Sequence, residues 1–191
     1  MIMSGVLRGL LLVAFALSLA GCGSSAKSEA DLAADALGRG LKAQNAGQFD
    51  EATAAYFETL FHDSKNKFAF FNLGTIAQLQ KKQPQIAEGY YRSALEIDPR
   101  FASALFNLAI IRDAAGAKAE AIDLYRRTIQ ADPNSAAAYF NLAILLRDTG
   151  ATAEANQMFA KAQQLDPKLV PPASPSPTAT PARTASPSPT R

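Results

Sequence analysis

The sequence predicts an all-α protein, a superhelix of four helix-turn-helix units, and three observations lead to this fold. Asp-Pro pairs recur at one fixed interval (133 − 99 = 34 and 167 − 133 = 34), at Pro99, Pro133 and Pro167. The string Phe-Asn-Leu, followed by Gly or Ala, precedes each pair and begins at Phe71, Phe106 and Phe140. Glycines stand midway in three of the units, at Gly47, Gly116 and Gly150. A period of this length indicates stacked structural repeats.

The stretch 102–135 illustrates how one unit is expected to fold. Two apolar-periodic segments of helical length flank Gly116, and the second segment ends at Asp132 and Pro133. Glycine adopts the left-handed backbone of a tight turn at low cost. Proline ends a helix because it has no N–H and restricts the residue before it. The unit is therefore predicted to be a helix, a turn and a second helix.

Small residues are expected where the two helices of a unit meet. One alanine recurs in the second helix of each unit, at Ala52, Ala87, Ala121 and Ala155. An aromatic residue follows four positions later on the same helical face, at Tyr56, Tyr91, Tyr125 and Phe159. The small side chains allow close helix approach. A helix pair this short cannot bury its apolar face alone, so the units are expected to stack into one core.

This set of Leu, Gly or Ala, Ala, aromatic and Pro positions resembles the tetratricopeptide repeat. The resemblance covers four units, taken in order as 33–66, 67–101, 102–135 and 136–169. The first unit is degenerate, with Ser64 where the proline belongs. The second has one extra residue, because 87 − 52 = 35, and its turn glycine is replaced by the string Lys81-Lys82-Gln83-Pro84. The last two units keep the pattern.

Residues 1–21 are expected to form a secretory leader. Arg8 is the only charged side chain before Lys27, and the segment 9–20 is apolar or small, a length that suits a signal peptide better than a bilayer span. The ending Leu-Ala-Gly-Cys22 resembles the bacterial lipobox. That resemblance implies lipidation of Cys22 with diacylglycerol, cleavage just before it, and a tether at 22–32. An ordinary signal peptide and an uncleaved anchor are the alternatives.

The segment 170–191 is expected to be a disordered tail. It holds seven Pro, four Ser and four Thr, and the hexamer Ala-Ser-Pro-Ser-Pro-Thr occurs in it twice. A segment of this composition cannot form a core and favours extended polyproline conformations.

Composition argues against several classes of function. The formal net charge of +2 comes without a basic stripe, so nucleic acid is not an expected partner. The single cysteine excludes an intrachain disulfide and a cysteine metal cluster. The single histidine, His62, is expected at a helix end, and its polar neighbours are too close in sequence to converge as a catalytic triad. No cofactor, metal or enzymatic activity is predicted.

The resemblance implies that the first helices of the units line a concave groove. Phenylalanine and asparagine rows, a row four residues beyond the phenylalanines, and Phe68 make up the candidate partner-binding set: Phe68, Phe71, Asn72, Thr75, Phe106, Asn107, Ile110, Phe140, Asn141 and Ile144. Asparagine amides can both donate to and accept from a peptide backbone. Two other interpretations stay open: the rings pack between helices, and the asparagines bond the backbone of the next unit.

The groove is expected to be apolar, unlike the cationic carboxylate clamps of chaperone-binding family members. The corresponding positions hold Phe68, Phe71, Ser103, Phe106, Ala137 and Phe140. We therefore expect a non-catalytic scaffold that binds a segment of an envelope protein, attached by its lipid to the extracytoplasmic face of a bacterial membrane. The alternative is a self-associating structural envelope lipoprotein. Weak homodimerisation is also expected if Met158 and Leu165 leave the last unit uncovered.

Overall fold

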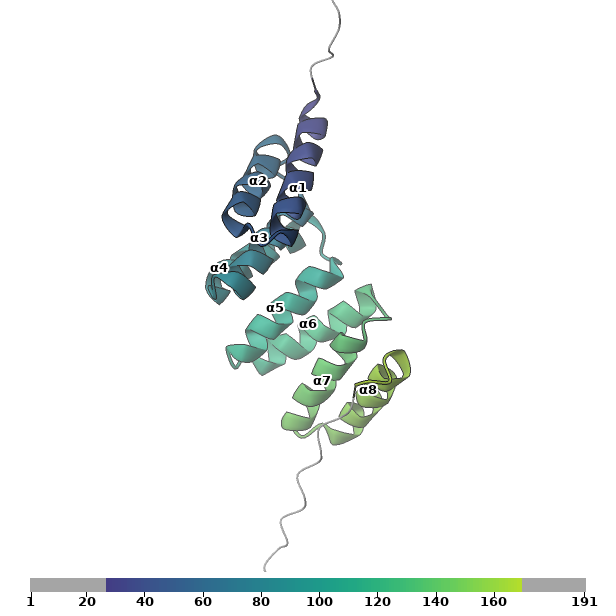
Figure 1. The fold of residues 1–191 in the computed structure, drawn as a ribbon. Helices are drawn as coiled ribbons and strands as arrows, with labels where there is room; N and C mark the ends of the chain where they lie inside the picture. Colours follow the sequence, from purple (N-terminus) through teal and green to yellow (C-terminus); the bar gives the residue numbers. More distant parts are fainter. Residues whose placement is uncertain (1–26, 170–191) are drawn as a thin grey trace, which may run out of the picture.

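The computed structural model describes residues 27–169, so the leader, Cys22 and the tail 170–191 lie outside the described residues. Eight α-helices and one π-helical turn make up the described part of the chain, arranged as an elongated array (Figure 1). The elements in order are α1 (Glu29–Asn45), α2 (Phe49–His62), α3 (Lys67–Thr75), η1 (Ile76–Gln80), α4 (Pro84–Ile97), α5 (Ala102–Ala114), α6 (Lys118–Ala131), α7 (Ala136–Asp148) and α8 (Thr152–Leu165).

The helices pair in chain order and the pairs then stack. Within the units, α1 packs on α2, α3 on α4, α5 on α6, and α7 on α8. Between units, α2 packs on α3, α4 on α5, and α6 on α7, which makes the array continuous from end to end (Figure 1). The four helix-turn-helix units predicted from the spacing are confirmed.

The first helix begins at Glu29, four residues before the expected start of its unit. Ser28 caps it: the Ser28 hydroxyl oxygen accepts from the backbone N–H of Asp31 at 3.1 Å, and the Asp31 carboxylate accepts from the Ser28 N–H at 3.2 Å. This reciprocal capping box satisfies two N–H groups that the helix cannot pair itself. The expected tether 22–32 therefore shares its last four residues with α1.

The turn of the second unit adopts a left-handed backbone without a glycine. Three turns reach positive φ with glycine, at Gly47 (75°), Gly116 (77°) and Gly150 (89°). Lys82 takes the same place in the second unit with φ 51°. A side chain makes this conformation costly, because Cβ crowds the following carbonyl.

The extra residue of the second unit is absorbed by η1. The N–H of Lys81 donates to the carbonyl of Ile76 at 3.1 Å, a bond that spans five residues. This wider turn keeps the small residues aligned with their aromatic partners: Gly74 and Tyr91 are 17 apart (91 − 74), whereas Gly40 and Tyr56 are 16 apart (56 − 40). The π-helical turn thus preserves the stacking of the unit despite the insertion.

The core lies where alanines and aromatic rings interlock, as the sequence predicts. The alanine row is fully buried, with 0% exposure at Ala52, Ala87, Ala121 and Ala155. The rings four residues later are also buried, at Tyr56, Tyr91, Tyr125 and Phe159. A Cβ added to Gly74 would lie 2.6 Å from Cε1 of Tyr91, so this glycine is needed for the close approach of α3 and α4.

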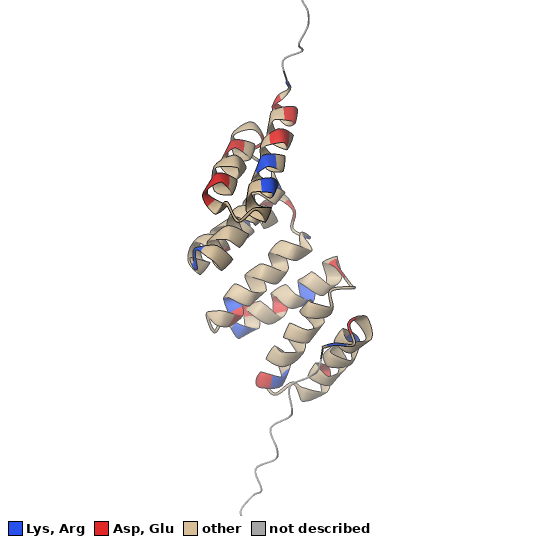
Figure 2. Ribbon diagram, in the orientation of Figure 1, with Lys and Arg blue, Asp and Glu red and all other residues tan. Residues whose placement is uncertain are grey.

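Ion pairs join the second helices of successive units on the outer surface. Arg92 on α4 contacts Glu120 on α6 at 3.0 Å, and Arg126 on α6 contacts Glu154 on α8 at 2.7 Å. In contrast, α5 and α7 carry charged residues only in their last turns (Figure 2). The first two turns of α5 and of α7 are therefore uncharged.

At the C-terminal end of the array, Met158 and Leu165 each keep part of the side chain accessible, so the expectation of weak homodimerisation through this end stays a prediction. Both side chains are half-buried, and Met158 packs against the core. Polar residues also replace apolar ones on the outer side of the last helix. Asn156 and Gln163 stand one repeat interval after Ile122 and Ile129, two isoleucines that pack against the core. The last unit thus carries its own polar cover, as terminal repeats commonly do.

Candidate functional site

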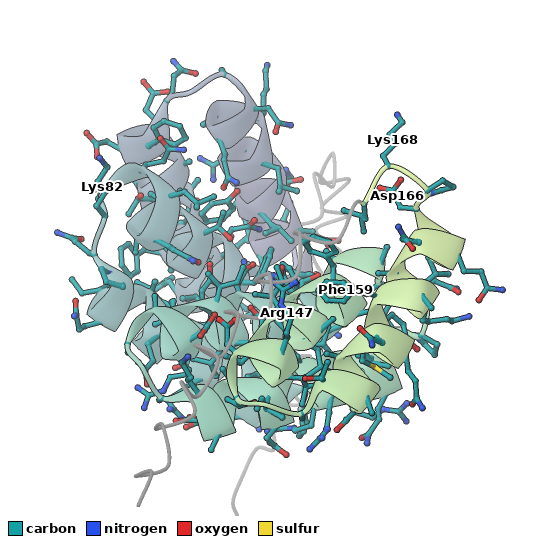
Figure 3. The ribbon with its side chains drawn as sticks, turned by 90° about the horizontal axis from the view of Figure 1, so that it is seen from below. Lys82, Arg147, Phe159, Asp166 and Lys168 are labelled. Atoms are coloured by element: carbon teal, nitrogen blue, oxygen red, sulfur yellow. The ribbon has the colours of Figure 1, made fainter. Side chains whose placement is uncertain are left out.

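One face of each first helix lies on the inner side of the curved array. On α7, Phe140, Ile144 and Arg147 are spaced four and three residues apart and so share a face. Viewed end-on, Arg147 lies toward the middle of the array beside Phe159, whereas Lys82 lies at the periphery (Figure 3). Of the predicted groove positions, Phe140 and Ile144 share this face with Arg147.

The phenylalanine row packs within its own units. Each ring meets the aromatic side chain of the second helix, with centroids 5.8 Å apart for Phe71 and Tyr91, 5.8 Å for Phe106 and Tyr125, and 5.5 Å for Phe140 and Phe159. All three phenylalanines are half-buried. The interpretation that the rings pack between helices is therefore confirmed, and each ring keeps part of its surface on the inner face.

The asparagine row makes two hydrogen bonds across unit boundaries. Nδ2 of Asn107 on α5 donates to Oη of Tyr91 on α4 at 3.1 Å, and Nδ2 of Asn141 donates to Oη of Tyr125 at 3.4 Å. The sequence-based alternative placed this bond on the backbone of the next unit, and that detail is wrong. Asn72 differs, because its Nδ2 donates to the carbonyl of Phe68 in its own helix at 2.9 Å.

The tyrosine hydroxyls are held as neutral donors and acceptors. The hydroxyl of Tyr91 donates to Oε1 of Gln78 at 2.8 Å, and that of Tyr56 donates to Oε1 of Gln44 at 2.8 Å. Burial raises the pKa of Tyr56 and of Tyr125 to about 12, and it also raises the pKa of Tyr91. The phenolate form is disfavoured because the buried ring environment solvates charge poorly.

A polar row on the inner face was missed by sequence reasoning. It consists of one residue per unit at intervals of 34, 35 and 34: Gln44, Gln78, Asp113 and Arg147. Each member interacts with the aromatic residue of its own unit, as Gln44 and Gln78 do by accepting from Tyr56 and Tyr91. Burial is the main cause of the raised pKa of Tyr125, and the negative charge of Asp113 is a further cause. Arg147 lies 5.5 Å from the Phe159 ring centre. The row was hidden because its spacing recurs while its residue types change.

This row adds two charged groups beside the predicted apolar positions. A carboxylate, Asp113, and a guanidinium, Arg147, stand one unit apart beside the apolar positions. Ile110 and Ile144 are half-buried and lie between the phenylalanine and polar rows in sequence. The inner face therefore carries half-buried phenylalanines and isoleucines, which we call the apolar strip, beside the polar row. The charge of this row is negative at Asp113 and positive at Arg147.

The two remaining predicted positions differ in their exposure. The Thr75 hydroxyl donates to the carbonyl of Phe71 at 3.0 Å and lies 3.5 Å from the hydroxyl of Tyr91. Phe68 is 48% exposed and packs edge-on against Phe101, with Lys67 Nζ 5.2 Å from the Phe68 ring centre. Phe68 thus belongs to an aromatic and cationic cluster at the edge of the array rather than to the packed row.

His62 acts in the described structure as a contact between helix ends. Its Nδ1 lies 2.6 Å from Oε2 of Glu29, which joins the end of α2 to the start of α1. Across residues 27–169, no group of three or more His, Cys, Asp or Glu side chains is arranged to hold a metal ion. Within the same range, no helix is both long and apolar enough to cross a bilayer.

Two family models described as tetratricopeptide repeat match residues 76–136 and 124–164. The helical array is a tetratricopeptide-repeat array. The two matches lie in the second to fourth units, which carry the recurring Asp-Pro pairs. The first unit of the tetratricopeptide array is recognised from its helix pair and packing.

Photosystem I assembly protein Ycf3 from two organisms is similar to part of this chain. The protein from Cyanophora paradoxa is 36% identical over 83 residues, which cover 42% of this chain and 47% of that protein. The protein from Rippkaea orientalis (strain PCC 8801 / RF-1) is 34% identical over 83 residues, with the same coverage of 42% and 47%. The match thus spans about half the length of these relatives.

Several solved structures share the fold at low identity. MamA superposes with a TM-score of 0.62 at 23% identity, covering 71% of this chain and 79% of MamA. YrrB, described as a TPR protein with an unusual peptide-binding site, gives 0.59 at 24% identity, covering 71% and 70%. The pilF protein of Pseudomonas aeruginosa gives 0.65 at 22% identity, covering 75% and 65%. These likenesses concern the fold alone.

Proposed function

We propose that this chain is a non-catalytic scaffold that holds a segment of a partner protein on its inner face, and that Cys22 anchors it by lipid in the bacterial cell envelope. There it would help to assemble an envelope complex, on the extracytoplasmic face of a membrane. The inner face supports the proposed binding role, because half-buried rings and isoleucines alternate there with oriented amides.

The asparagines of the inner face are suited to hold a peptide main chain. Asn107 commits one N–H to Tyr91, and an asparagine amide has a second N–H and a carbonyl oxygen. Because the tyrosine fixes the amide plane, little side-chain entropy remains to be lost when a partner binds. The protein named YrrB is described as having a peptide-binding site, and Ycf3 is named as an assembly protein, which fits this role.

The polar row suggests which side chains the bound segment carries. Asp113 favours a basic side chain near the third unit, and Arg147 favours an acidic or aromatic side chain near the fourth. Apolar side chains of the segment would contact the strip containing Ile110 and Ile144. We propose a segment with apolar residues between a basic and an acidic position.

Capture of envelope proteins tests the binding role. Ile110→Asp combined with Ile144→Asp places charge on the apolar strip without removing the Tyr91–Asn107 bond. Ala119→Asp, at an exposed site on α6, is the control. Folded wild type and the control variant should capture the same partner, and the double variant should lose it. Equal capture by all three proteins would defeat the groove proposal, and recovery of only the chain itself would favour self-association.

Phase partitioning tests the anchor. Wild type should enter the detergent phase and show the mass of an acylated N-terminal cysteine, because two acyl chains give stable membrane attachment. Cys22→Ser should stay in the aqueous phase or retain its leader. The same partitioning for both proteins, with an unmodified cysteine in wild type, would contradict the proposed lipoprotein.

A further inference from the structure

Exposed large apolar side chains gather in the first half of the array. Among the described residues they are Leu41, Phe57, Phe61, Phe68, Leu79 and Ile86, all within the first two units. Phe57 and Phe61 are 49% and 84% exposed and stand four residues apart on α2, so they share one helical face. With Ile86 on α4, which is 50% exposed, they form what we call the apolar ridge.

The apolar ridge stands where the other unit boundaries have ion pairs. Arg92 and Glu120 are separated by the same interval as Arg126 and Glu154 (120 − 92 = 28 and 154 − 126 = 28), and both pairs join second helices. The equivalent positions at the first boundary are Phe57 and Ile86, 29 apart (86 − 57) because η1 contributes the extra residue. Apolar side chains have thus replaced a solvated ion pair at this one boundary.

The ridge lies at the end of the array that the proposed lipid would hold. His62 Nδ1 lies 2.6 Å from the Glu29 carboxylate, and the Phe61 ring centre lies 5.0 Å from that of His62. The last turn of α2 therefore adjoins the first turn of α1. Lys27 is five positions after Cys22 (27 − 22), which limits their separation to about 18 Å even in a fully extended chain.

Three carboxylates near the ridge have partners within the protein. Glu58, next to Phe57 in sequence, pairs with Arg39 at 2.6 Å. Glu29 contacts His62, and Asp63 accepts from the backbone N–H of Lys65 at 3.1 Å. The Arg39 guanidinium therefore compensates the charge of Glu58, which lowers the cost of bringing this part of α2 to a lipid surface.

We propose that the apolar ridge docks on the phospholipid surface that carries the Cys22 anchor. The phenylalanine rings would enter the boundary between headgroups and acyl chains, where aromatic side chains on amphipathic surfaces bind. This inference rests on the proposed lipid anchor. Docking through the outer side of α2 would leave the inner face of the array turned toward the aqueous phase and open to a partner.

The chain contains no tryptophan, so one introduced indole reports on one site. Phe61→Trp places it on the ridge. Gln164→Trp is the matched control, because Glu96, Gln130 and Gln164 follow Phe61 at the repeat interval and Gln164 holds the same register in the fourth unit. Both full-length lipidated variants are reconstituted in phosphatidylethanolamine and phosphatidylglycerol vesicles, with or without bromine near the top of the acyl chains. Circular dichroism verifies that both variants are folded.

Bromine should quench Phe61→Trp emission to about half, with a blue shift, because the indole would lie at acyl-chain depth. The emission of Gln164→Trp should stay unchanged. Vesicle-bound protein with neither variant quenched would overturn the docking and leave the anchor standing. A blue shift without quenching would mean that a second copy covers the ridge and would also overturn it. Protein that fails to float with the vesicles would refute the anchor and the docking together.

Discussion

The side-chain amide of Asn107 on α5 donates to the hydroxyl of Tyr91 on α4, with 3.1 Å between Nδ2 and Oη. This hydrogen bond joins two units and at the same time fixes an amide on the inner face. Tyr91 in turn donates to Gln78, so three side chains from two units form one chain of hydrogen bonds. Stacking of the units and the orientation of the candidate binding groups are therefore coupled.

The coupling between Asn107 and Tyr91 can be measured with a double-mutant cycle. We expect Asn107→Ala and Tyr91→Phe each to lower the free energy of unfolding, with a coupling energy of about 0.5 to 1.5 kcal/mol, the range of a neutral intramolecular hydrogen bond. Urea unfolding of wild type, both single variants and the double variant gives this value. Strictly additive effects would contradict a direct bond.

Stability is expected to fall in alkaline solution through the buried tyrosines. Burial raises the pKa of Tyr125 to about 12, from an ordinary value near 10, so between these values the folded state holds a proton that the unfolded state has lost. The stabilisation is complete below pH 10 and is lost as the pH rises toward 12. When the pH is raised from 9 to 11, the free energy of unfolding of Tyr125→Phe should fall by about 1 kcal/mol less than that of wild type.

Phenylalanine is a suitable replacement for this test because Phe159 occupies the same position in the fourth unit. Urea unfolding at the two pH values provides the comparison. Identical losses for the variant and wild type would show that Tyr125 does not titrate differently in the folded state.

The alanine row is expected to be intolerant of larger side chains. Ala121 has 0% exposure, so Ala121→Leu should overpack the meeting point of the helices and cost about 1 to 3 kcal/mol of unfolding free energy. Ala119, two residues earlier on α6 and exposed, is the control site, and Ala119→Leu should change stability little. Equal urea midpoints for the two variants would contradict the packing.

The left-handed turn of the second unit is expected to store strain. Lys82→Gly should raise the free energy of unfolding by up to about 1 kcal/mol, because glycine adopts φ 51° without a Cβ clash. The reciprocal change, Gly116→Lys at φ 77°, should lower it by about 1 to 2 kcal/mol. Thermal melts of both variants test this pair, and a destabilised Lys82→Gly would mean that the lysine side chain makes a compensating contact.

The number and order of the helices could be predicted because their signals are local. Asp-Pro pairs, turn glycines and the buried alanine row all act within one unit, and the structure places them as expected. The start of α1 was missed because Ser28 and Asp31 form their capping box outside the repeat pattern. The form taken by the extra residue was also not predictable, because a π-helical turn and a longer loop fit the same residue count.

The candidate site was only partly predictable for the same physical reason. The phenylalanine and asparagine rows were visible as identical letters at a fixed interval, whereas Asp113 and Arg147 were hidden because their types differ. That Met158 is half-buried follows from packing between helices and has no mark in the local sequence.

The sequence by itself determined four helix pairs, their boundaries at proline and glycine, and the faces on which alanines and aromatic rings lie, because backbone restriction and helical periodicity operate over a few residues. Only the tertiary structure decided which groups meet across unit boundaries. Asn107 reaches Tyr91, and Phe61 comes to adjoin the start of α1, because stacking brings together residues that are far apart along the chain. Those contacts depend on the relative position of helices, which no local pattern specifies.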